Sequence, residues 1–252
     1  MVRKPAIHGH YKAEEEKAYR LSMYQEKMNE LLDNNTIMIA TDGYCVGKIN
    51  GLAVLDMGDY SFGSPTRITA TTYMGKSGIV NIEKEAEMSG PTHNKGVQII
   101  TGYLGRMYAQ KMPLSLSCRI AFEQNYNGID GDSASSTELY CILSSLSEIP
   151  VNQSLAVTGS VNQCGEIQAI GGVTHKIEGY FDLCSRRGLT GKQGVVIPES
   201  NVNDLVLKDD VIEAVKNGMF HIYSISTIDE GIELLLGMEA GVMDENGDYP
   251  PE

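Results

Sequence analysis

One serine, Ser133, stands in a setting that suits nucleophilic chemistry. It lies in the run GIDGDSASS at residues 128–136, where glycines and aspartates make a tight turn and small residues follow. An apolar-periodic run begins at Leu139, so the turn is predicted to enter a helix. The first N–H groups of a helix are unpaired and its dipole is positive there, so an oxyanion formed beside the serine hydroxyl would be stabilised.

The same run also has a purely structural interpretation. Ser135 and Glu138 have the spacing of a capping box, and Asp132 or Ser133 could itself cap the helix. On this stretch alone, capping is favoured over catalysis, because a serine is a poor nucleophile unless a base activates it.

Lys176 is the first candidate for that base. It lies 43 residues after Ser133 (176 minus 133), early in a helix predicted to follow a glycine pair, where the helix dipole disfavours a cation. A lysine that works at neutral pH needs its pKa lowered by burial from about 10.4 to about 7, which corresponds to about 4 kcal/mol. Most lysines on helices are instead solvated.

Two histidines are the alternative. His93 or His175 could form a Ser-His-Asp arrangement with Asp130 or Asp132 as the orienting carboxylate. Neither histidine lies in a recognisable hydrolase setting, and the GxSxG elbow is absent because Ser135 occupies its second glycine position. The residues alone therefore leave the base open.

Composition limits the classes of partner. The chain has 252 residues and a formal net charge of −13, which argues against a nucleic-acid partner. The five cysteines are an odd, scattered set without a CxxC pair, which is typical of reduced thiols in an intracellular protein. The N-terminal stretch lacks the apolar region of a signal peptide, and no run approaches the roughly 18 apolar residues that span a membrane. These features predict a soluble, cytoplasmic protein.

The elements that must position these residues alternate between β-like and helical patterns. They predict a single α+β domain with an added N-terminal helix, and they place Ser133 between a strand and a helix. Strands are predicted at 36–40, 45–49, 52–57, 67–73, 79–82, 114–124, 155–161, 166–170, 194–198 and 220–224, and helices at 13–33, 93–110, directly after Ser133, 173–187, 206–217 and 228–236.

A phosphate-binding loop is suggested by Gly75-Lys76-Ser77 but fails on inspection. The motif needs a glycine five residues before Gly75, and that position is Ala70. The segment also has the pattern of a turn between strands. The sequence therefore predicts no ATPase of this type.

Several separate segments resemble, in the right order, the proteolytic domain of Lon proteases. The likeness spans roughly residues 18–238. The aspartate before the serine, where the A-type branch has proline, makes the chain most similar to the B-type branch. The resemblance implies an α+β fold with several small β-sheets and about six helices. The segments are VGKINGLAV (46–54), FGSPTRITA (62–70), SGPTHNKGV (89–97), GDSAS (131–135), TGS (158–160) and GGVTHKIE (171–178).

The resemblance also implies a role for each matching residue. Ser133 matches the catalytic nucleophile and Lys176 the general base of a Ser–Lys dyad, while Thr158 matches the hydroxyl that steadies the lysine amine. Asp132 and Asp130 match acidic positions of the loop before the serine. In relatives this loop can adopt inactive arrangements in which an acidic residue pairs with the lysine, which would raise the pKa of the base. No metal is implied.

The remaining side chains of these motifs are interpreted as supporting ones. His93 and His175 are expected to be structural or to lie near the substrate. Arg67 is expected to be a structural ion-pair partner, and Glu178 to lie on a helix surface or a ring interface.

Lon proteases usually carry an AAA+ ATPase module that this chain lacks. ATP and Mg are therefore expected only for a missing AAA+ module, and the chain itself is expected to need no cofactor. It is either an excised proteolytic domain or a descendant of a protein with a degenerate motor. The predicted division is a leader and charged connector helix at 1–35, the proteolytic domain at 36–238 and a loose tail at 239–252.

Three functions are compatible with these motifs. The first is a serine endopeptidase domain of an ATP-dependent protease, a hexameric ring that degrades unfolded or damaged proteins without contacting nucleic acid or a membrane. The second is a catalytically idle scaffold or chaperone ring of the same fold, and the third is a self-cleaving Ser–Lys regulator. The presence of Ser133, Lys176 and Thr158 favours the first, and no obvious scissile loop supports the third.

Overall fold

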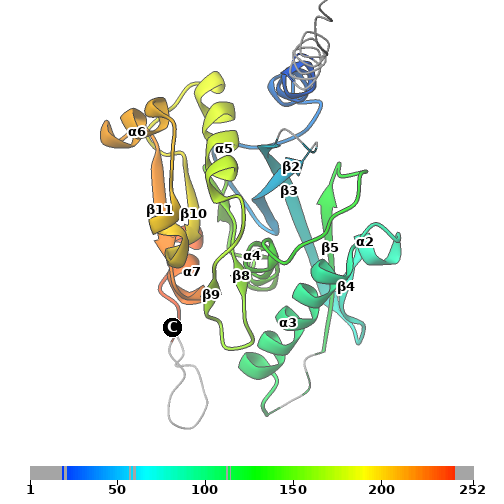
Figure 1. The fold of residues 1–252 in the computed structure, drawn as a ribbon. Coiled ribbons are helices and arrows are strands. Elements are labelled where there is room, and N and C mark those ends of the chain that lie inside the picture. The colour runs from blue at the N-terminus through cyan, green and yellow to red at the C-terminus, as the bar shows by residue number, and fades with distance from the viewer. Residues whose placement is uncertain are drawn as a thin grey trace, which may run out of the picture.

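The centre of the fold is a seven-stranded mixed sheet (Figure 1). The computed structural model describes residues 19, 22–56, 58, 61–111, 113 and 115–241. The strand order is β11-β10-β7-β2-β3-β5-β4, and two further sheets pair β1 with β6 and β8 with β9. The strands are β1 (Tyr44–Cys45), β2 (Lys48–Asp56), β3 (Ser61–Met74), β4 (Gly78–Asn81), β5 (Leu116–Glu123), β6 (Val151–Asn152), β7 (Leu155–Val157), β8 (Ser160–Val161), β9 (Ile167–Gln168), β10 (Gly194–Pro198) and β11 (His221–Ile225).

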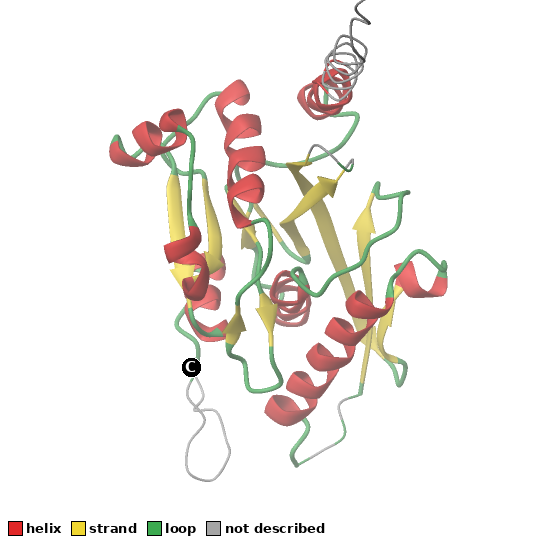
Figure 2. Cartoon of the chain, in the orientation of Figure 1, coloured by secondary structure: helices red, strands yellow, loops and turns green. Residues whose placement is uncertain are grey.

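Helices surround this sheet (Figure 2). Six of those in the described part of the chain have eight residues or more, which confirms the predicted α+β fold with about six helices. They are a helix at 22–33, α3 (Pro91–Tyr108), α4 (Ser135–Ser147), α5 (Val173–Arg187), α6 (Asp209–Lys216) and α7 (Ile228–Leu236), and the shorter ones are α2 (Ile82–Glu85) and the 3-10 helix η1 (Glu199–Asp204).

The sheet separates two hydrophobic cores. Side chains of a strand alternate between its two faces, and along β10 Val195 and Ile197 belong to one core while Val196 belongs to the other. The core that contains Val196 also contains buried residues of α3, α4 and α7, whereas the other contains those of α5 and α6. Helices α4 and α5 therefore lie on opposite faces of the sheet.

Several predicted elements have the bounds that the sequence indicated. Strand β10 and helices α5 and α7 begin and end where predicted. The segment Gly75-Lys76-Ser77 is a turn between β3 and β4, as expected for a failed phosphate loop. The guanidinium of Arg67 forms an ion pair of 2.9 Å with Glu123, which confirms its structural role.

The predicted strand at 36–40 is wrong. Residues 36 and 37 form a bend, and the segment pairs with no strand in the described part of the chain. The side chain of Gln124 takes the place of one, since it accepts a hydrogen bond from the N–H of Met38 at 2.8 Å and donates one to the carbonyl of Thr36 at 2.7 Å. A side-chain amide can form the backbone hydrogen bonds that a neighbouring strand would otherwise form. A hydrophobic pattern in the sequence does not show which of these two partners a segment has.

Two other predicted strands have different limits. The residues predicted as strands 45–49 and 52–57 form β1 and the continuous strand β2, with a break at Gly47, which has a φ of 62°. The predicted strand at 155–161 is likewise divided into β7 and β8, and the interruption contains Thr158.

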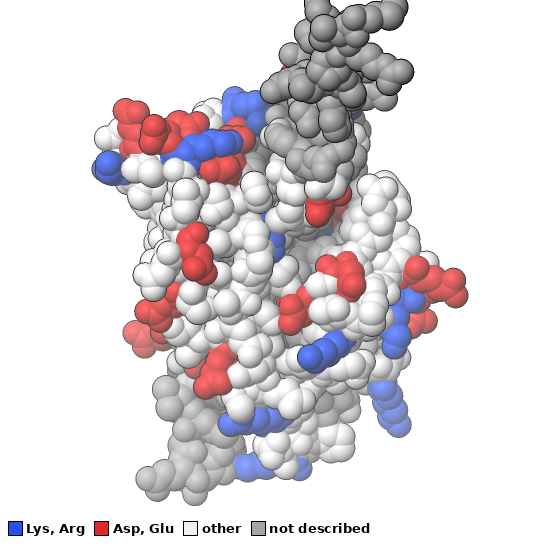
Figure 3. Space-filling view, in the orientation of Figure 1, with Lys and Arg blue, Asp and Glu red and all other residues white. Residues whose placement is uncertain are grey.

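The predicted leader at 1–18 and most of the predicted tail, 242–252, lie outside the described residues. No helix in the described part of the chain is long and apolar enough to cross a membrane. On the face shown in Figure 3, acidic and basic side chains are interspersed and form no continuous basic surface.

Candidate active site

Three segments that are distant in sequence supply the site. Ser133 lies in the turn between β5 and α4, two residues before the helix begins. Lys176 is the fourth residue of α5, and Thr158 follows the last residue of β7. Since α4 and α5 lie on opposite faces of the sheet, their N-terminal ends meet beyond the end of the short strand β7.

The structure brings the three predicted residues into hydrogen-bonding contact. The Nζ atom of Lys176 lies 2.9 Å from Oγ of Ser133 and 3.0 Å from Oγ1 of Thr158. The hydroxyl of Thr158 donates to the carbonyl of Ser133 at 3.1 Å, and the N–H of Gly159 donates to the same carbonyl at 2.8 Å. The backbone of Ser133 is thus fixed by the segment that also holds the lysine amine.

Burial changes the acidity of Lys176. Only 3% of the residue is exposed, and this burial lowers the pKa of its amine from 10.5 to about 8, against the opposing charge of Asp132. No carboxylate of the described residues forms an ion pair with it; its two partners are hydroxyls. An amine in such a setting loses its proton close to neutral pH.

The two acidic residues of the loop have other partners. Asp132 accepts a hydrogen bond from the hydroxyl of Ser160 at 3.0 Å. Asp130 accepts from the backbone N–H groups of Thr92 at 3.0 Å and His93 at 3.2 Å, at the start of α3. A hydrogen bond from the N–H of Gly131, followed by those from His93 and Thr92, lowers the pKa of Asp130. The loop therefore does not have the inactive arrangement in which a carboxylate pairs with the lysine.

The predicted capping box is wrong. The N-cap of α4 is Ala134, without a side-chain cap. Ser135 instead accepts a hydrogen bond from the N–H of Val161 at 3.0 Å, and Glu138 is bonded to His93 at 3.0 Å. Both side chains are buried, so tertiary partners replace the local ones that the spacing indicated.

Neither candidate histidine is bonded to Ser133. His93 is buried against Glu138 and Ser89, and His175 is exposed on α5. Glu178 lies further along the same helix and forms an ion pair of 3.4 Å with Lys208. Of the bases that the sequence left open, only Lys176 reaches the serine.

Two glycines that the sequence analysis did not single out set the position of α5. A Cβ atom at Gly63 in β3 would overlap the carbonyl of His175, and one at Gly179 would overlap the backbone of Gly63. The helix that carries Lys176 thus lies directly on the strand backbone. Gly63 belongs to the FGSP segment, so the signal was present, but nothing in one sequence says what a glycine faces.

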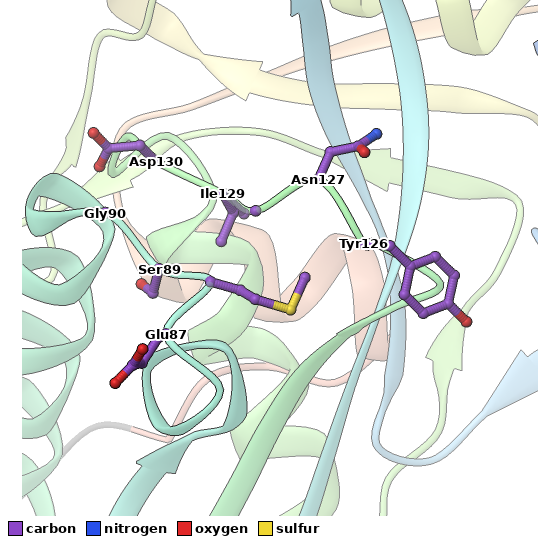
Figure 4. Close-up of a pocket in the computed structure, with 9 residues that line it drawn as sticks. Glu87, Ser89, Gly90, Tyr126, Asn127, Ile129 and Asp130 are labelled. Carbon is purple, nitrogen blue, oxygen red and sulfur yellow. The ribbon is translucent and has the colours of Figure 1, made fainter.

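An open groove of about 590 Å³ lies next to the nucleophile loop. It is lined by residues 87–90 on one side and 126–130 on the other, and Figure 4 shows the side chains of Glu87, Asp130 and Tyr126 around it. Asp130 ends this wall only three residues before Ser133 (133 minus 130). The groove is open to solvent.

Sequence comparison identifies the class of protein that has this fold and site. The family of the Lon protease (S16) C-terminal proteolytic domain matches residues 38–238, and the chain belongs to that family. The match does not resolve the branch, so the similarity to the B-type branch stays a prediction, as do the exact domain boundaries.

Three individual relatives illustrate the relationship. A putative Lon protease homolog of Escherichia coli (strain K12) is 38% identical over 226 residues, which cover 89% of this chain and 39% of the relative. A putative Lon protease homolog of Haemophilus influenzae is 42% identical over 219 residues, 86% of this chain and 36% of the relative. An archaeal Lon protease of Archaeoglobus fulgidus is 31% identical over 201 residues, 79% and 30% respectively. The chain therefore spans about two fifths or less of these relatives.

Proposed function

We propose that this chain is a serine endopeptidase domain that hydrolyses peptide bonds with Ser133 as nucleophile and Lys176 as general base. The observation that carries the proposal is the buried amine of Lys176 at 2.9 Å from the hydroxyl of Ser133, with no carboxylate partner among the described residues. A lysine needs its pKa lowered to act as a base, and burial among hydroxyls lowers it without adding a charge that would hold the proton.

The geometry supports the following sequence of steps. The neutral amine of Lys176 takes the proton of Ser133 while the serine oxygen attacks the peptide carbonyl. The ammonium group that forms donates to the hydroxyl of Thr158, and it returns a proton to the leaving nitrogen when the peptide bond breaks. Lys176, neutral again, then takes a proton from a water molecule whose oxygen attacks the acyl carbonyl. The bond to the Ser133 oxygen breaks, and that oxygen takes the proton back from Lys176 as the acid leaves.

Backbone groups at the nucleophile would stabilise the oxyanion. The N–H groups of Ser133 and Ala134 donate no hydrogen bond to any other described residue. Both precede the first turn of α4, where the helix dipole is positive. Free donors at this position suit the negative charge that develops on the substrate oxygen.

The wider activity is proposed from the family. Because the chain spans only part of its relatives, we assign ATP and Mg to a missing AAA+ module, and no cofactor to this chain. The proposed assembly is a homo-hexameric ring in the cytoplasm that receives unfolded or damaged proteins, without nucleic acid or membrane contacts. These statements rest on the resemblance to Lon proteases.

A labelling experiment tests the proposal. Wild-type protein and the Ser133→Ala variant are incubated with a serine-directed fluorophosphonate, the modified residue is mapped by mass spectrometry, and hydrolysis of a fluorogenic peptide is measured in parallel. We expect labelling of Ser133 and peptide hydrolysis in the wild type, and loss of both in Ser133→Ala.

The matched control is Ser147→Ala, which removes an exposed hydroxyl at the other end of α4 and leaves both activities unchanged. Full hydrolysis by pure Ser133→Ala protein would contradict the proposed nucleophile. A wild-type protein that is folded, unlabelled and inactive would instead support an idle scaffold.

A further inference from the structure

The segment that carries the nucleophile rests on one helix. This nucleophile segment, residues 130–138, runs along the first turns of α3. A Cβ atom at Gly96 of α3 would lie 3.4 Å from Cβ of Ser135 and 3.5 Å from Cβ of Asp132, and one at Gly90 would overlap the side chain of Asp130. The two glycines therefore let the segment approach the helix closely on both sides of Ser133.

His93 contacts this segment before and after the serine. Its backbone N–H donates to Asp130 at 3.2 Å, three residues before Ser133. Its ring Nε2 lies 3.0 Å from Oε1 of Glu138, five residues after Ser133. One residue of α3 thus holds both the loop that enters the nucleophile position and the helix that leaves it.

The other ring nitrogen of His93, Nδ1, is bonded to the loop at residues 88–90, and this loop is hydrogen-bonded to the residue before the nucleophile segment. Nδ1 of His93 lies 2.7 Å from Oγ of Ser89. The hydroxyl of Ser89 donates to Asn94 at 2.9 Å, so its oxygen accepts from the ring. Residues 88–90 are in turn joined to Ile129 by two backbone hydrogen bonds of 2.8 Å, Gly90 N–H to the Ile129 carbonyl and Ile129 N–H to the Met88 carbonyl.

The contact is sealed from water. His93 is 1% exposed and Glu138 is completely buried, and the ring of Phe122 meets the imidazole edge to face at 5.3 Å. The second carboxylate oxygen of Glu138 has no hydrogen-bond partner among the described residues. A buried carboxylate that depends on one partner is costly to separate from it, so the pair resists displacement of the nucleophile segment.

We infer that His93, through its buried bond to Glu138, is a positioning residue that holds the nucleophile segment so that the hydroxyl of Ser133 meets the amine of Lys176. This inference rests on the proposed function. A histidine needed only for core stability could be bonded to any buried polar group. The partners of His93 are instead Asp130 and Glu138, which precede and follow Ser133 in the same segment.

His93→Phe tests the inference, because phenylalanine keeps an aromatic ring beside Phe122 and loses both ring nitrogens. Each protein is assayed well below its own unfolding temperature for kcat and KM on a fluorogenic peptide and for the rate of Ser133 labelling by a fluorophosphonate. A nucleophile displaced by about 1 Å loses on the order of 10²-fold in rate. We expect kcat and the labelling rate to fall about 10- to 100-fold while KM changes less than about 2-fold.

Ser144→Ala is the matched control. It removes a buried hydroxyl near the far end of α4, which bonds to Gly47 and to Ile149. This variant should lose stability and keep its kcat and labelling rate. A His93→Phe protein that is folded and retains both rates would overturn the inference.

Glu138→Gln decides the question if His93→Phe does not fold. Glutamine keeps the shape of the side chain and an oxygen that accepts from the ring, but weakens the bond. The expected loss of kcat and labelling rate is about 3- to 10-fold. Where His93→Phe does fold, the double variant should lose less than the product of the two single losses. Unchanged rates in Glu138→Gln would overturn the inference, whereas an unlabelled, inactive wild type would remove the proposed function and this inference with it.

Discussion

Two buried ionisable side chains, those of Lys176 and His93, contact the nucleophile segment, and they have opposite kinds of hydrogen-bond partner. Lys176 is bonded to two neutral hydroxyls, whereas His93 is bonded to the carboxylate of Glu138. Burial lowers the pKa of both bases. At His93 the hydrogen bond and the charge of Glu138 outweigh that effect and raise its pKa, but at Lys176 the charge of Asp132 does not, and its pKa falls to about 8.

The difference shows how one interior can hold a proton at one place and release it at another. The partner, and not the depth of burial, decides which happens. A base bonded to a carboxylate suits a fixed structural contact, and an amine bonded only to neutral hydroxyls suits proton transfer. Four variants test this contrast.

The largest effect is expected from Lys176→Arg. Arginine stays protonated at any working pH and cannot accept the proton of Ser133. We expect kcat/KM for a peptide to fall on the order of 10³-fold in a folded protein. Near-normal turnover, measured with the fluorogenic peptide, would show that Lys176 is not the base.

The second variant breaks the contact between His93 and Glu138. Glu138→Leu removes the carboxylate and leaves Nε2 of the His93 ring without its partner in an apolar interior. Loss of one member of a buried pair should reduce the free energy of unfolding by about 3 kcal/mol. Urea denaturation measures it, and a midpoint equal to that of the wild type would contradict the importance of the pairing.

The third variant removes the amine of Lys176, and its effect on the free energy of unfolding should have the opposite sign to that of Glu138→Leu. The pKa of Lys176 falls from 10.5 to about 8 on folding, so at neutral pH burial of the charge opposes folding by about 3 kcal/mol. Lys176→Met removes this penalty of about 3 kcal/mol but also loses two hydrogen bonds that stabilise the fold by about 1 kcal/mol each. The free energy of unfolding should therefore rise by about 1 kcal/mol at pH 7.

The pH dependence of that gain follows from the lowered pKa. The penalty is complete below the folded pKa of about 8 and disappears as the pH rises past the unfolded value of 10.5. The advantage of Lys176→Met over the wild type should therefore shrink and reverse between pH 7 and pH 10.5. Urea denaturation at both pH values checks this, and an advantage that grows with pH would contradict it.

The smallest effect is expected from Asp132→Asn. The charge of Asp132 raises the pKa of Lys176, so its removal lowers that pKa further. The rising limb of the pH–rate profile should move to lower pH by less than about one unit, with more activity at neutral pH. Asparagine can still accept the bond from Ser160, which keeps the loop in place. A shift to higher pH, or none in a folded variant, would count against the lysine as base.

Local patterns in the sequence predicted most of the fold. Strand β10 and helix α7 were found because their apolar residues and their flanking turns agree. The predicted strand at 36–40 was wrong because its partner is the side chain of Gln124, 86 residues away. The capping box was wrong because Glu138 bonds to His93 instead of to its own helix.

The three residues that the structure brings into contact were predicted through several motifs in order and not through spacing. Nothing local in the sequence places Lys176 beside Ser133, since the contact depends on two helices that meet at the end of β7. The contacts of His93 with Asp130 and Glu138 could not be predicted either. A histidine in a helix pattern does not reveal that its two partners lie on other elements.

The close contact between Gly63 and α5 has a consequence for descent in this family. A side chain at position 63 cannot fit under the carbonyl of His175, so a lineage that acquires one must lift the helix, and Lys176 rises with it. The proposed dyad would then lose its hydrogen bond although serine and lysine are both present in the sequence. Inheritance of the serine and the lysine is therefore not sufficient for the proposed activity, and a glycine without any chemistry of its own belongs in the signature by which members with that activity would be recognised.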